Sequence, residues 1–144
     1  MTGYARNPKL ATYQSVSTHG DFASADPHRL VLMLMDGALE RLAIARGCIT
    51  RKGRGDIGRK ANALSQALSI VTELRGRLNL AQGGELAQNL SDLYDYMQRR
   101  LLRGNAESDL ACIDEVASLL SEIRNAWIAI GPEVRQAAGS PAVA

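Results

Sequence analysis

The sequence predicts an all-α protein: an antiparallel up-down four-helix bundle with a flexible N-terminal arm. Three observations support this fold class. Apolar residues recur at intervals of three and four positions in four separate segments, which is the period of a helix. Short polar or glycine-rich connections separate these segments. The 144 residues are 46% hydrophobic but only 4% aromatic, a composition that suits one helical domain with a substantial core.

The first helix is predicted over 27–52. Asp26 offers a side-chain acceptor at the N-cap, and Pro27 suits the first helical position. The segment carries two apolar stripes, one of Leu30, Leu34, Ala38, Leu42, Ala45 and Ile49, the other of Leu32, Met35 and Leu39. A helix that is apolar nearly all round is either deeply buried or covered by a partner. A strand over 30–35 is the weaker alternative, because the cap lies upstream and helix formers continue beyond it.

Three further helices are predicted over 56–80, 84–103 and 109–130. Glycines at 53, 55 and 58 separate the first two helices, and residues 79–84 form the next connection. Ser108 or Asp109 caps the last helix. The bundle therefore spans 25–131, between a flexible arm over 1–24 and a flexible tail over 132–144.

The third helix carries an unusual pair of rings. Its predicted apolar stripe consists of Leu86, Leu90, Leu93, Met97 and Leu101. Tyr94 and Tyr96 do not both lie on that stripe, so the two rings point in different directions. Aromatic rings outside a core seam are typical of a surface that binds another polypeptide. The pattern alone leaves open whether the rings do so or only line the edge of the core.

Nothing in the sequence predicts an enzyme, a cofactor or a metal site. Residues 53–58 match the dinucleotide-binding glycine pattern, but a helix rather than a strand precedes them. The two histidines, His19 and His28, do not follow a glutamate by three positions, as a two-metal bundle site requires. We expect His28 to form a local hydrogen bond or to face solvent.

Charge and hydropathy exclude other classes. A net charge of +2 is too small to indicate a nucleic-acid-binding protein. The longest apolar run, 30–35, is far shorter than the roughly 20 residues of a membrane span, and no secretion signal opens the chain. Cys48 and Cys112 have no pairing motif, so we expect buried reduced thiols in a cytoplasmic protein.

Four blocks in order resemble the flagellar secretion chaperone family: 26–39, 83–90, 93–97 and 123–127. The resemblance implies a cytoplasmic, non-enzymatic bundle that binds the disordered C-terminal segment of flagellin. Binding would prevent premature polymerisation and hold flagellin ready for the flagellar type III export apparatus. In this family a tyrosine-glutamine pair in the arm can lie over part of the cargo surface, and Tyr13 with Gln14 matches it.

The predicted flagellin-binding residues are therefore Tyr13, Leu32, Met35, Leu39, Tyr94 and Tyr96. We expect no cofactor, no nucleic-acid partner and no membrane insertion, and a monomer or weak homodimer. The alternative is a helical regulatory module that binds another protein or nucleic acid through the basic loop, which contains Arg51, Lys52 and Arg54.

Overall fold

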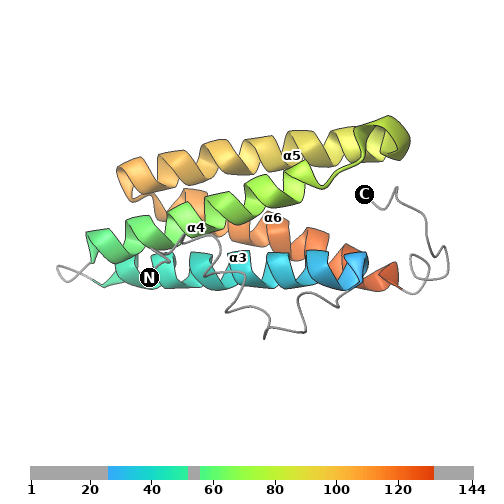
Figure 1. Ribbon diagram of the computed structural model, residues 1–144. Coiled ribbons are helices and arrows are strands. Elements are labelled where there is room, and N and C mark those ends of the chain that lie inside the picture. The colour runs from blue at the N-terminus through green and yellow to red at the C-terminus, as the bar shows by residue number, and fades with distance from the viewer. Residues whose placement is uncertain (1–25, 52–55, 132–144) are drawn as a thin grey trace, which may run out of the picture.

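The computed structural model describes residues 26–51 and 56–131 as four helices (Figure 1). These are α3 (Pro27–Thr50), α4 (Ile57–Gly76), α5 (Leu80–Glu107) and α6 (Leu110–Ala129). Successive helices run in opposite directions, and the described ranges contain no strand. The predicted all-α up-down bundle is therefore confirmed. The predicted arm and tail, and part of the basic loop, lie outside the described residues.

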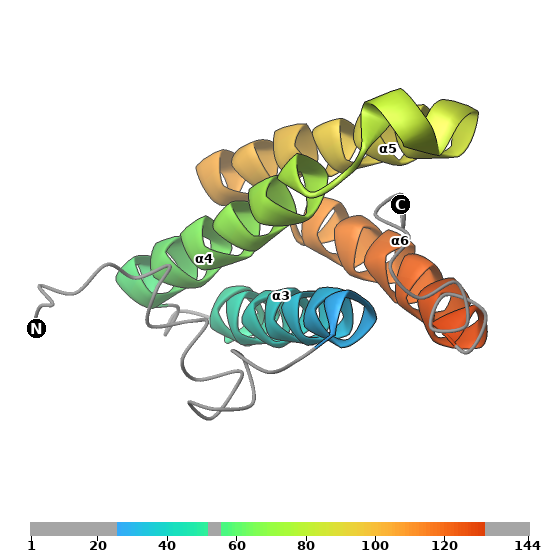
Figure 2. The same cartoon turned by 45° about the vertical axis from the view of Figure 1, so that its right-hand side comes forward.

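Each helix packs against its neighbours in the chain, and α6 returns to pack against α3, which closes the ring. The seam between α5 and α6 is the least extensive of the four. Figures 1 and 2 both show the two helices diverging toward the start of α5 and the end of α6. The bundle is thus closed at one end and spread at the other.

Aspartates begin three of the helices. The Asp26 carboxylate accepts the backbone N–H of Arg29 at 2.7 Å, and Asp56 accepts that of Arg59 at 2.9 Å. Asp109 caps α6 through the N–H of Ala111. Each bond satisfies a donor that has no partner within the helix.

The third helix differs most from its predicted bounds of 84–103. Asn79 caps an extra turn through the N–H of Gln82 at 3.0 Å, so α5 begins at Leu80. Gly84 then kinks the helix at φ 60°, a conformation that glycine adopts without a Cβ clash.

At the other end, α5 continues past Gly104 to Glu107, and Ser108 closes it in the left-handed conformation. A Cβ at Gly104 would lie 3.3 Å from Cys112 Cβ, so this glycine permits close packing of α5 on α6 instead of ending the helix. The other helices end near their predicted limits, although α4 stops at Gly76 rather than 80.

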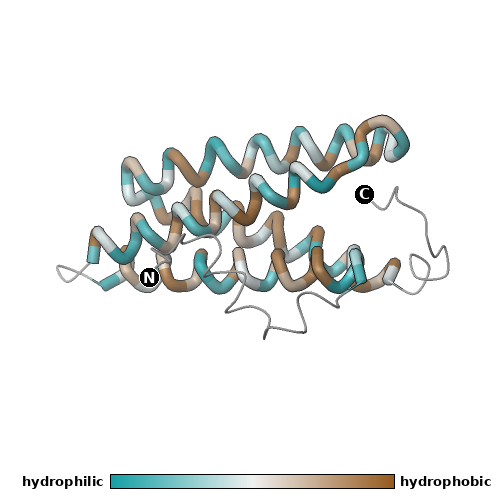
Figure 3. Tube along the Cα trace, viewed as in Figure 1, coloured by the Kyte–Doolittle hydropathy of each residue, from teal (hydrophilic) through white to brown (hydrophobic). Residues whose placement is uncertain are grey.

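The core runs along the bundle axis, and apolar residues recur along every helix (Figure 3). Met35 is 1% exposed and belongs to this core. Of the other apolar stripe of α3, the core contains Leu34, Ala38, Leu42 and Ala45, and the partly buried Leu30 and Ile49 pack against it. Leu86, placed in the core stripe by its spacing, is instead 63% exposed, and Ala87 next to it is buried. In the turns that directly follow the Gly84 kink, the buried residues of α5 are the small Ala87 and Ser91. No helix in the described ranges is long and apolar enough to cross a membrane.

Candidate functional site

An apolar pocket lies at the spread end of the bundle, where all four helices contribute to its wall. Its volume is about 110 Å³. The lining residues are Pro27, Val31 and Met35 in the first turns of α3; Leu74 near the end of α4, with Arg77 and Leu78 just after it; Leu90 and Tyr94 in α5; and Ile123 and Trp127 in α6. The pocket can therefore accept an apolar group only while the four helices hold their arrangement.

Met35 and Tyr94 are among the least exposed parts of the lining, at 1% and 3%. Burial raises the pKa of Tyr94 to about 12, because the phenolate would lose its hydration there. The ring is therefore neutral at physiological pH and presents an aromatic wall.

Arg77 is the one charged residue of the lining. Its Nε lies 3.2 Å from Glu73 Oε2, one turn back along α4. The Arg77 side chain is about two-fifths exposed, so it lies at the boundary between the apolar pocket and solvent. A ligand here would meet hydrocarbon inside and a cation at the edge.

His28 and Trp127 join the start of α3 to the end of α6 beside the pocket. The Trp127 indole N–H donates to the His28 carbonyl at 2.9 Å, and His28 Nε2 lies 2.7 Å from the Trp127 carbonyl. The rings stack with centroids 5.0 Å apart. The expectation of a local or solvent-facing His28 is therefore wrong, because its partner lies 99 positions away and its side chain is buried.

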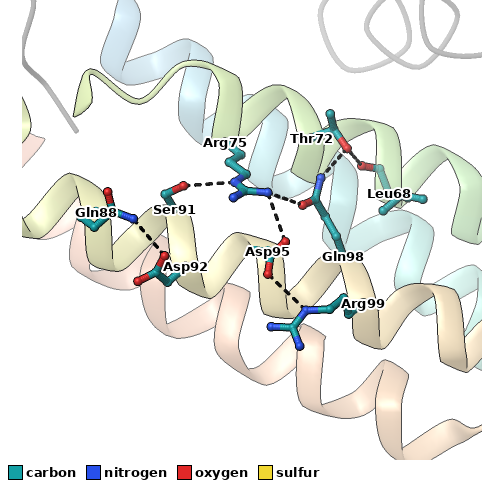
Figure 4. Close-up of polar contacts among 9 residues, drawn as sticks. All are labelled: Leu68, Thr72, Arg75, Gln88, Ser91, Asp92, Asp95, Gln98 and Arg99. Atoms are coloured by element: carbon teal, nitrogen blue, oxygen red, sulfur yellow. Dashed lines mark hydrogen bonds and ion pairs between the residues drawn. The ribbon is translucent and has the colours of Figure 1, made fainter. Parts of the chain in front are cut away.

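A hydrogen-bond network fastens α4 to α5 behind the pocket (Figure 4). Arg75 donates to Ser91 Oγ at 3.1 Å, to Asp95 Oδ1 at 3.2 Å and to Gln98 Oε1 at 3.1 Å. Gln98 in turn donates to Thr72 Oγ1 at 2.8 Å. Because one guanidinium contacts three positions on α5, the network sets the register of the two helices.

The seam between α5 and α6 is tied at only one place in the described ranges. The Tyr96 hydroxyl donates to the Glu115 carboxylate at 2.8 Å, and Arg100 Nε donates to the same group at 2.8 Å. The bond to Glu115 is the main reason that the pKa of Tyr96 is raised. Among the described residues, no other side-chain hydrogen bond crosses this seam between the Glu115 contacts and the pocket.

The structure brings together two of the predicted site residues and separates the others. Met35 and Tyr94 share the pocket. Leu32 and Leu39 are half-buried on α3 outside its lining, and Tyr96 makes the α5–α6 tie. Tyr13 lies outside the described residues. The two tyrosines do point in different directions, as predicted.

Sequence reasoning missed most of the pocket. Trp127 was expected in the core, and it is buried, but it also lines the pocket with Ile123 and Leu90. Each of these residues looks like an ordinary member of an apolar stripe. The sequence offered one signal for the pocket, which was the position of these residues near helix ends. An up-down bundle brings those helix ends to the same side of the protein.

The described residues contain no group of three potential metal ligands. Cys48 and Cys112 are both buried and free, as expected. Burial also raises the pKa of the Cys112 thiol. These side chains therefore serve as small core residues and offer no reactive centre.

Comparison with known proteins identifies the family. Residues 9–134 match the family described as flagellar protein FliS. The flagellar secretion chaperone FliS of Salmonella typhimurium is 44% identical over 125 residues, covering 86% of this chain and 90% of the relative. FliSB of Pseudomonas aeruginosa is 43% identical, with 82% and 91% covered, and FliS of Bacillus subtilis is 34% identical, with 96% and 98% covered. The chain therefore belongs to the FliS family of flagellar secretion chaperones, which are not enzymes.

Proposed function

We propose that this chaperone binds the disordered C-terminal segment of flagellin in the cytoplasm. Bound flagellin would be unable to polymerise prematurely and would stay competent for the flagellar type III export apparatus. The observation that carries the proposal is the apolar pocket between four helices at the spread end of the bundle. Membership of the FliS family supports the same role.

A disordered segment that folds on binding suits this surface. Such a segment loses conformational entropy when it orders, so it must bury a large apolar area in return. An amphipathic helix does this by laying its apolar face into a groove with spaced anchor residues. The apolar pocket lies at the end of the bundle where α5 and α6 diverge (Figure 2), and it could receive one anchor residue of such a helix.

The pocket size suits one anchor side chain. An apolar protein cavity of about 150 Å³ accommodates benzene. At about 110 Å³, the pocket here is somewhat smaller. We therefore expect a single leucine, isoleucine or methionine of flagellin to enter it, beside Tyr94 and Trp127.

Isothermal titration calorimetry with a synthetic flagellin C-terminal peptide tests the proposal. We compare Leu90→Ala, which shortens a half-buried pocket residue, with Leu102→Ala, which makes the same change at a 57% exposed position of α5 outside the pocket lining. Leu90→Ala should weaken binding about tenfold, which corresponds to about 1.4 kcal/mol, the scale of an interface residue that contributes to binding. Leu102→Ala should bind like the parent protein. Circular dichroism confirms that both variants are folded.

Binding of the parent protein should show a large negative heat-capacity change, because apolar surface is buried. Absence of binding at tens of micromolar across several flagellins would contradict the proposed client. Equal losses of peptide affinity in Leu90→Ala and Leu102→Ala would instead show that the binding surface lies away from the pocket.

A further inference from the structure

Residues 79–86 form a strap between two residues that line the apolar pocket. Leu78 reaches the pocket from just after α4, and Leu90 reaches it from α5. The strap contains the first turn of α5 and the kink at Gly84. Two of its residues are half-buried, and the other six are exposed. The strap is therefore anchored beside the pocket at both ends, while most of its own length faces solvent.

Gly84 provides a hinge within the strap. Its φ of 60° and ψ of −142° lie in a region that glycine reaches easily and that an L side chain disfavours. A Cβ built on Gly84 would meet no atom of the described residues within 4 Å, so neighbouring side chains do not impose this conformation. Hinges are positions at which a few residues absorb a change in φ and ψ. Rotation at Gly84 can therefore move the first turn of α5 relative to the rest of the helix.

The first turn of α5 is stabilised by hydrogen bonds of its own. The Asn79 side chain accepts the Gln82 backbone N–H at 3.0 Å and donates to the Gln82 side chain at 3.2 Å. The Gly83 N–H donates to the Asn79 carbonyl at 2.7 Å. All three bonds lie within residues 79–83, so the turn can move as a unit without breaking them. The remainder of α5 is instead tied to α4 and α6 by side-chain hydrogen bonds farther along the helix.

Two exposed leucines flank the hinge. Leu80 is 51% exposed and Leu86 is 63% exposed. Leu86 lies four positions before Leu90, so the two share one side of α5 and continue the apolar surface beyond the pocket. The spread end also carries Ile128 and Ile130, so it holds four of the six large apolar side chains that are exposed within the described ranges. Such a concentration of exposed apolar side chains is typical of an interaction surface.

We propose that the strap closes over the client helix once an anchor side chain of the client occupies the apolar pocket. Rotation at Gly84 brings Leu80 against the client, and Leu86 extends the contact from the pocket wall. The client is the occupant because the strap begins and ends at the pocket lining. An amphipathic helix supplies the apolar face that both leucines require, and their burial offsets part of the entropy lost on ordering. This role of the strap rests on the proposed function, the binding of the flagellin C-terminal segment.

Hydrogen exchange of the full chain, followed by mass spectrometry with and without the flagellin C-terminal peptide, tests the closure. Amides of residues 80–88 should exchange about tenfold more slowly in the saturated complex, because the closed strap opens less often. Amides of residues 104–107, at the opposite end of α5, should exchange as in the free protein and serve as the internal control. Unchanged exchange across 80–88 in a saturated complex would overturn the strap while leaving the binding of flagellin intact.

Leu86→Ser and Leu102→Ser compare two leucines of α5 that are exposed to a similar extent, 63% and 57%, of which only Leu86 belongs to the strap. Leu86→Ser should weaken peptide binding in calorimetry about tenfold, the change expected when most of one leucine side chain is buried on binding. Leu102→Ser should stay within about twofold of the parent protein. Equal peptide affinities of the two variants would overturn the closed strap. Circular dichroism confirms that both variants are folded.

Gly84→Ala tests the hinge, with Gly47→Ala as the control at a helical glycine of α3 whose Cβ also has open space. Alanine disfavours a φ of 60° and favours a continuous helix, which would hold the strap away from the client. The strap should therefore stay unprotected in the saturated complex of Gly84→Ala, and the affinity should fall about fivefold. Gly47→Ala should match the parent protein in both measurements. Full protection of the strap in Gly84→Ala would overturn the hinge.

Two further results bear on the partner of the strap. Protection of residues 80–88 that rises with protein concentration in the absence of peptide would overturn the client contact in favour of a second copy of this chain. Failure of the parent protein to bind the peptide at tens of micromolar would overturn the proposed function and the strap together.

Discussion

Replacing Tyr94 by phenylalanine is expected to change the alkaline stability of the protein while leaving its stability near neutral pH almost unaltered. The Tyr94 ring is 97% buried on the wall of the apolar pocket, since only 3% of the residue is exposed. Within the described residues its hydroxyl forms no hydrogen bond. Removal of the hydroxyl at about pH 8 should therefore alter the free energy of unfolding by less than about 1 kcal/mol.

The alkaline effect follows from the pKa. Burial raises the pKa of Tyr94 from 10.0 to about 12 in the folded protein. Because the folded state retains the proton more strongly, Tyr94 contributes stability below pH 10 that is lost as the pH rises through 10 to 12. At about pH 11, the unfolded side chain is ionised roughly ten to one while the folded one stays mostly neutral. The parent protein should then lose about 1.4 kcal/mol relative to Tyr94→Phe.

Urea unfolding of the parent protein and of Tyr94→Phe, followed by far-ultraviolet circular dichroism at about pH 8 and pH 11, measures the difference in their free energies of unfolding. Ionisation of the other groups occurs in both proteins, so its effect cancels in this difference. Absorbance at the tyrosinate band reports the Tyr94 titration independently. A stability difference that does not change between the two pH values would refute the reasoning. So would a Tyr94 that titrates near 10, because its ring would then be exposed in solution.

Two further predictions concern the start of α3 and the end of α6. Trp127→Phe removes the 2.9 Å hydrogen bond to the His28 carbonyl and part of the ring stacking. It should therefore lower the free energy of unfolding, measured by urea titration, by about 1–3 kcal/mol. A loss below about 0.5 kcal/mol would show that the contact contributes little to stability. Gly131→Ala should cost about 1–3 kcal/mol, because its Cβ would lie 2.7 Å from His28 Cε1. Gly47→Ala, whose Cβ meets nothing within 4 Å in α3, should instead stabilise the protein by up to about 1 kcal/mol. Thermal melts of the two alanine variants should therefore shift in opposite directions, and shifts of the same sign would contradict the packing at Gly131.

The proposed binding site has a simple physical basis. The α4–α5 network fixes one wall, and the His28–Trp127 contact fixes the opposite one. The Tyr96–Glu115 tie holds α5 to α6 at a distance from the pocket. The apolar pocket is thus formed before a client arrives, which lowers the entropic cost of binding to a disordered segment.

Interactions between residues close together in the sequence determined much of the fold. Asp26 and Asp109 are N-caps because an aspartate beside a helical segment satisfies a free backbone N–H wherever the helix lies in the protein. The helical period identified four helices because it depends only on neighbours three or four positions away. The ordered sequence blocks also indicated the FliS family, since they preserve the residues and spacing of its members.

Tertiary structure decided which faces those helices bury and what lies between them. Met35 joined the core and Leu86 did not, because the kink at Gly84 and the neighbouring helices determine which side of each stripe is covered. Gly104 lies inside α5, where the close approach of Cys112 leaves little room for a larger side chain, a contact that no local rule predicts. His28 and Trp127 meet across 99 positions, and the apolar pocket takes residues from all four helices. Local propensity acts over a few residues, whereas such contacts exist only once the whole bundle has assembled.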